Sequence, residues 1–136
     1  MQPFGSATQF PLNVPTGETT QGGPVEESVL IPAGTTTTQT AVQLGAVDFK
    51  SLALVVNVTA GTSVTVTVTG VTASGYTYTL LTSAALAPTS TTALTIGPGL
   101  PVTANVSANT ILPRFITVTA TVNTAATFGV DYILSY

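Results

Sequence analysis

The chain has 136 residues with two basic and five acidic side chains, which give a net charge of −3 at pH 7. It contains no Cys and no His. This excludes a disulfide framework and a thiolate metal site, and it removes the side chain that most often acts as general base or metal ligand. Two cations cannot neutralise the several phosphates that nucleic-acid binding requires, so we expect no nucleic-acid partner. The charged fraction of 5 % is far below the roughly 25 % of an ordinary soluble domain, which leaves little charge repulsion against association.

Residues 1–25 differ in composition from the rest of the chain. They contain four Pro and four Gly, which disfavour regular structure, so we expect an extended N-terminal arm. Two interpretations stay open: a disordered terminus, or an arm that docks on a neighbouring subunit. Apolar side chains favour docking, since a solvated tail has little need of them. The predicted partner-binding residues of the arm are Phe4, Phe10, Leu12 and Val14.

Neither a leader nor a membrane segment is evident. The first ten residues, MQPFGSATQF, lack the positive and apolar regions of a signal peptide. The longest apolar run, residues 52–56, is too short to span a bilayer. We therefore expect synthesis in the cytoplasm and no membrane partner.

Residues 26–136 are predicted to form a single β domain. Short segments of alternating apolar and polar residues are separated by turn residues, which is typical of an antiparallel β-sandwich or a jelly-roll-like fold. No segment has the period and the caps of a long helix. Predicted turns include Pro32-Ala33-Gly34, Ala60-Gly61 and Asn123-Thr124. The predicted strands are residues 26–31, 37–45, 51–59, 63–71, 75–82, 91–96, 102–107, 114–123 and 126–135.

The alternation also assigns side chains to faces, with Thr pointing outward and apolar residues inward. The stretch TSVTVTVTGV, residues 62–71, is fully uncharged, whereas exposed edge strands are usually guarded by charges. We interpret it as a strand that can join another chain in an assembly. The predicted inward residues are Leu52, Leu54, Val56, Val58, Val64, Val66, Val68, Ile116, Val118, Ala120, Val122, Phe128, Val130, Tyr132 and Leu134.

The sequence offers few residues that could act in catalysis or bind a metal. Ser and Thr are abundant, but a nucleophile needs a base, and Lys50 lies at the start of a strand, where a solvated or ion-paired Lys is the ordinary case. We expect Asp131, on the outward face of the last strand, to pair with Arg114 or Lys50. Glu26 and Glu27 are adjacent, but two carboxylates cannot supply the six to eight oxygen ligands that Ca²⁺ takes. We therefore predict no catalytic residue, no metal site and no cofactor, and expect that the protein is not an enzyme.

Two tyrosines alternate along one predicted strand, as in an aromatic platform for a sugar. Tyr76 and Tyr78 have no Trp beside them, and the polar residues of a sugar site are not evident. We interpret both as core or interface residues.

Five segments follow one another in the C-terminal two-thirds of the chain: LALVVNVTAGTSVTVTVTGV, ASGYTYTLL, TTALTIGPGL, NTILPRFITVTATVN and ATFGVDYILSY. In their order and spacing, residues 50–136 resemble a group of small virion structural proteins of tailed bacteriophages. These are the β-sandwich head decoration (cement) proteins and their minor structural relatives. The resemblance is one of pattern, because the family shares no active site and no ligand residues carry over. The N-terminal 25 residues match no family pattern.

The resemblance implies a non-enzymatic capsid decoration protein that binds the outer surface of the head and stabilises the capsid. The implied partners are the major capsid protein and further copies of this chain, with a trimer favoured. The implied location is the outer surface of the head of the virion, after synthesis in the host cytoplasm. Two alternatives remain: a minor tail, fibre or turret component, and a cell-surface adhesin or carbohydrate-binding β-sandwich. The missing leader and the missing Trp argue against the second.

Overall fold

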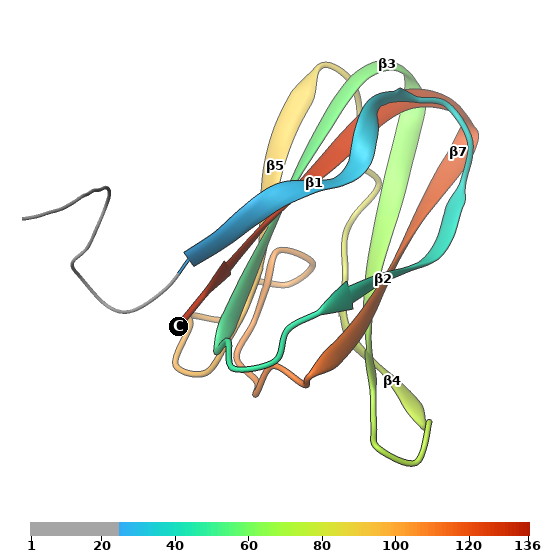
Figure 1. The fold of residues 1–136 in the computed structure, drawn as a ribbon. Coiled ribbons are helices and arrows are strands. Elements are labelled where there is room, and N and C mark those ends of the chain that lie inside the picture. The colour runs from blue at the N-terminus through green and yellow to red at the C-terminus, as the bar shows by residue number, and fades with distance from the viewer. Residues whose placement is uncertain (1–24) are drawn as a thin grey trace, which may run out of the picture.

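The computed structural model describes residues 25–136, which form an all-β domain without a helix (Figure 1). This confirms the predicted all-β class. The strands form one sheet that is antiparallel except for a short parallel pair. They are β1 (Val25–Thr35), β2 (Gln39–Gly45), β3 (Ser51–Val71), β4 (Thr77–Thr82), β5 (Ser90–Ile96), β6 (Ser107–Ala108) and β7 (Phe115–Ser135).

Two long strands form the centre of the sheet. β3 and β7 have 21 residues each, and they pair from Ser51 opposite Ser135 to Val71 opposite Phe115. The first part of β3 pairs with β5 and its last part with β4. The last part of β7 pairs with β1 and its first part with β2. Each half of the β3–β7 pair therefore carries its own two flanking strands.

The predicted division of these two long segments is wrong. The sequence predicted turns at Ala60-Gly61 and Asn123-Thr124, but both lie inside continuous strands. Gly61 has φ 95° and Thr124 has φ 71°, and the β3–β7 register shifts on both sides of Ala60. These left-handed residues bend the paired strands instead of reversing the chain. Figure 1 shows both ribbons turning over at the same end of the molecule.

Both halves of the folded sheet contribute to one hydrophobic core. Leu54 and Val56 lie before the bend and Val66 and Val68 after it, and all four side chains are fully buried. The predicted inward residues are confirmed except Val122 and Tyr132, which are half-buried. Full burial of such side chains stabilises the fold by about 1.5–3 kcal/mol each.

Smaller differences between the predicted and observed strands arise at turns. β1 continues through the predicted turn at Pro32-Ala33-Gly34 by means of register shifts. Residues 104–106 in the middle of the predicted strand 102–107 form a turn, because the Ser107 hydroxyl accepts from the Thr103 amide and donates to the Pro101 carbonyl. Only Ser107–Ala108 adds to the sheet, as β6.

The bend in β3 gives a direct test of this packing. A Cβ added to Gly61 would lie 2.5 Å from the Ala125 carbonyl oxygen and from the Ala126 Cα, whereas one added to Gly75 would meet nothing within 4 Å. Both glycines have positive φ, so G75A carries the backbone strain of about 1–3 kcal/mol without the clash. We expect G61A to lower the free energy of unfolding clearly more than G75A in chemical denaturation. Equal losses would contradict the close approach of β3 and β7 at the bend.

The face assignment is tested by placing an Asp at two neighbouring positions of β3. Val66 is fully buried, whereas Thr67 is half-buried on the outward side. Val66→Asp places an unpaired charge in the core, which costs about 3–5 kcal/mol, so we expect this variant to lose its cooperative thermal transition. Thr67→Asp should fold, as followed by circular dichroism. A folded Val66→Asp variant with the melting temperature of Thr67→Asp would show that the faces are misassigned.

Candidate functional site

The residues predicted to bind a partner lie outside the described part of the chain. Phe4, Phe10, Leu12 and Val14 all precede Val25, where β1 begins. Their role in partner binding stays a prediction. The candidate surfaces considered below therefore belong to residues 25–136.

The uncharged stretch 62–71 is not an edge strand, which corrects the interpretation drawn from its sequence. It pairs with β7 on one side, and Thr67 to Val71 pair with β4 on the other. Val64 also forms a bridge to Leu86. Strands of the same chain therefore cover the backbone groups of this segment. It does not need charged side chains to prevent pairing with another chain. Among the described residues, β1 forms a ladder with β7 only, so it is an edge strand of the described sheet.

The acidic side chains within the described part of the chain do not form a cluster of metal-ligand type. No group of three or more Asp, Glu, His or Cys is found within residues 25–136. The Tyr132 hydroxyl donates to the Glu26 carboxylate over 2.7 Å, and this hydrogen bond raises the pKa of Tyr132 above its ordinary value. The contact links β1 to β7, so its role is structural.

Asp131 lies on the outward face of the last strand, as the sequence predicted, but neither predicted cation lies beside it. It lies in the sheet between Val29 of β1 and Val55 of β3. The Lys50 amide donates to the Ser135 carbonyl at the end of β7, and Arg114 precedes the other end of that strand. Neither cation is a neighbour of Asp131 in the register, so its exposed carboxylate faces outward among apolar side chains.

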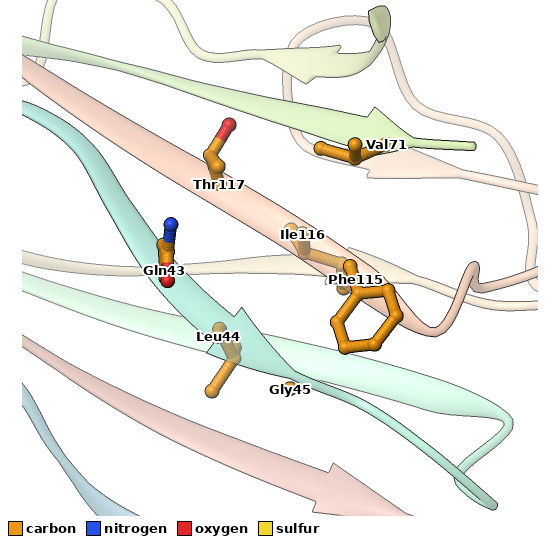
Figure 2. Close-up of a pocket in the computed structure, with 7 residues that line it drawn as sticks. All are labelled: Gln43, Leu44, Gly45, Val71, Phe115, Ile116 and Thr117. Carbon is orange, nitrogen blue, oxygen red and sulfur yellow. The ribbon is translucent and has the colours of Figure 1, made fainter. Parts of the chain in front are cut away.

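A hollow of about 520 Å³ opens where β2, β3 and β7 meet at one end of the sheet. Gly45, Phe115 and Val71 form one row across these strands, and Gln43 lies opposite Thr117 in the next outward row. Figure 2 shows the Phe115 ring on one side of the hollow, and Gln43 and Thr117 on the other. Phe115 is 55 % exposed.

The hollow offers a surface for binding a ligand, but none of its lining side chains is titratable. It is lined by Gln43, Leu44, Gly45, Val71, Phe115, Ile116 and Thr117. An aromatic ring beside one amide and one hydroxyl suits apolar contact with one or two hydrogen bonds. The sequence analysis did not identify it, because its walls come from three strands whose register is not visible in the sequence. One feature of the sequence does indicate this site. Phe115 occupies an outward position in a strand whose next outward residues are Thr117 and Thr119.

The two tyrosines do not form a common platform. Tyr76 lies before β4 and is 75 % exposed, so the interpretation as a core residue is wrong for this side chain. Tyr78 is in β4, and a Cβ on Gly70 would lie 2.8 Å from its Cζ and 2.9 Å from Pro113 Cγ. Gly70 therefore leaves room for the Tyr78 ring and Pro113, but Tyr78 is 43 % exposed, so the interpretation as a core residue is wrong for it as well. The interpretation of the two tyrosines as interface residues stays a prediction.

Comparison with family models, curated proteins and solved structures found no match to this chain. Within residues 25–136, no helix has the length and apolar character needed to cross a membrane.

Proposed function

We propose that the chain is a non-enzymatic structural protein of a virion: a capsid decoration protein that binds the outer surface of the head and stabilises it. The resemblance of residues 50–136 to decoration proteins of tailed bacteriophages motivates this proposal. Its partners would be the major capsid protein and further copies of the chain, with a trimer favoured. The proposed location is the outer surface of the head, after synthesis in the host cytoplasm.

One structural observation carries the proposal. Within residues 25–136, β1 is an edge strand, and its outward side chains Val25 and Val29 are 58 % and 56 % exposed. Edge strands recruit other chains unless charge or cover prevents it. β1 carries Glu26 and Glu27 near its start but no charged residue from Ser28 to Thr35, and exposed apolar side chains mark interaction surfaces. β1 follows the proposed arm directly, so the arm and β1 could contact the same partner.

The proposal includes a finer description of the fold. Because the bent β3–β7 pair gives both halves of the sheet a shared core, we assign the domain to the antiparallel β-sandwiches of jelly-roll-like form. In such a sandwich, the outward sides of the two halves become two opposite surfaces that are free to meet partners.

A second candidate function is a carbohydrate-binding surface protein. The observation that favours it is the hollow beside Phe115, where an exposed ring lies near the side chains of Gln43 and Thr117. A single ring and two polar groups make a small sugar site, so decoration remains the preferred proposal.

The proposed function is tested by the copy number of this chain in purified virus particles. Quantitative mass spectrometry should give about one copy of this chain per major capsid subunit if the chain covers the shell. A few copies per particle would place it at the tail or at a vertex instead. Absence from washed particles would contradict the viral proposal and favour the second candidate.

A further inference from the structure

The outward sides of the two halves of the sheet differ in chemistry. On the half that contains β1 and β5, one row runs Val29, Asp131, Val55 and Ala93 across four strands, and the next runs Glu27, Ile133, Ala53 and Thr95. We call these two rows the Val29 face. Five of its eight side chains are apolar, and Val29 is more than half exposed.

The outward side of the other half is rich in hydroxyl groups except at its end row, where Phe115 lies between Gly45 and Val71. Its three central rows pair Thr65 with Thr121, Thr67 with Thr119, and Thr69 with Thr117. We call these six residues the threonine face. Hydroxyl groups stay hydrated at little cost, whereas exposed Val and Ile side chains gain free energy when a partner removes them from water. Between these two surfaces, the Val29 face is the one that gains more from being covered.

The Val29 face is also shaped to receive side chains. Hollows lie on both sides of Ile133: one of about 290 Å³ includes Val29, Val55 and Asp131 in its lining, and one of about 210 Å³ includes Ala53 and Leu100. A partner can therefore interlock with this face, and does not simply have to lie flat on it.

The charged residues of the Val29 face indicate which kind of partner this face can bind. Glu27 and Asp131 are diagonal neighbours across the β1–β7 pair, a relation that places them about 7–8 Å apart. The two rows contain no basic residue. A second copy that packed the same face against this one would bring carboxylates close to carboxylates, and such like-charge contacts are costly. A partner surface with Lys or Arg at these positions would instead complement both charges.

We infer that the Val29 face is the docking surface for a partner protein whose contact area is apolar and carries Lys or Arg opposite Glu27 and Asp131. This inference rests on the proposed function, under which the partner is the outer surface of the capsid. The threonine face is then turned toward solvent. The proposal assigns an orientation to the bound subunit and a stated chemistry to its binding site on the shell.

The test uses two variants in the same strand. Asp131 and Thr121 are both exposed outward residues of β7, one on each face. The full chain carrying Asp131→Lys or Thr121→Lys would be titrated onto virus particles produced without this chain. We expect Asp131→Lys to weaken binding roughly tenfold or more, because it brings a cation against a cationic partner. Thr121→Lys should bind as the unmodified chain does, and both variants should keep its melting temperature.

The other outcomes separate this inference from the proposed function. If the unmodified chain binds the particles and Asp131→Lys binds equally well, the assignment of the face is wrong while the proposed function stands. If Thr121→Lys is the weaker binder, the orientation is reversed. If Asp131→Lys changes only the oligomeric state of the free protein, the face joins copies of this chain and the inferred partner is wrong. Failure of the unmodified chain to bind contradicts the proposed function and, with it, this inference.

Discussion

The pairing of β3 with β7 is the interaction on which the rest of the domain depends. Four of the other five strands hydrogen-bond directly to one of these two, and β6 attaches through β5. Because the two long strands bend together near Gly61 and Thr124, one ladder supplies the centre of both halves of the sheet. The inward residues of both halves consequently meet in one core. Ser51 is paired with Ser135, so the ladder also joins residues far apart in the sequence.

Much of the fold can be predicted from the alternation of side chains. Thr at every second position with Val between gives the faces of β3 and β7 correctly, because the period of a strand is two and only one side is buried. The bends could not be predicted. Gly61 and Thr124 need positive φ both in a chain reversal and in a bend of a continuous strand, and the choice depends on the partner strand. The turn at residues 104–106 was missed because the Ser107 side chain replaces ladder bonds there.

The candidate surfaces could be predicted less well than the fold. The sequence drew attention to the uncharged strand 62–71, which the structure places inside the sheet. The Phe115 hollow and the Val29 face each combine several strands, so they exist only once the register is known. The Val29 face also gives a physical meaning to the scarcity of charge. If the Val29 face is the docking surface, as we infer, Glu27 and Asp131 would select the partner by charge, and the apolar side chains would supply binding free energy.

Native-state hydrogen exchange can show whether a single β3–β7 ladder unites both halves of the domain. The amides to compare are those of Ala53 and Val55 before the bend with those of Thr65 and Thr67 after it. The Val66 amide is unsuitable, because it donates to the Ser83 hydroxyl and not to β7. If the ladder is one cooperative unit, all four amides should exchange only through global unfolding, with the same free energy of opening. If Thr65 and Thr67 exchange through a separate opening of lower free energy than Ala53 and Val55, the two halves are independent and the ladder does not unite them.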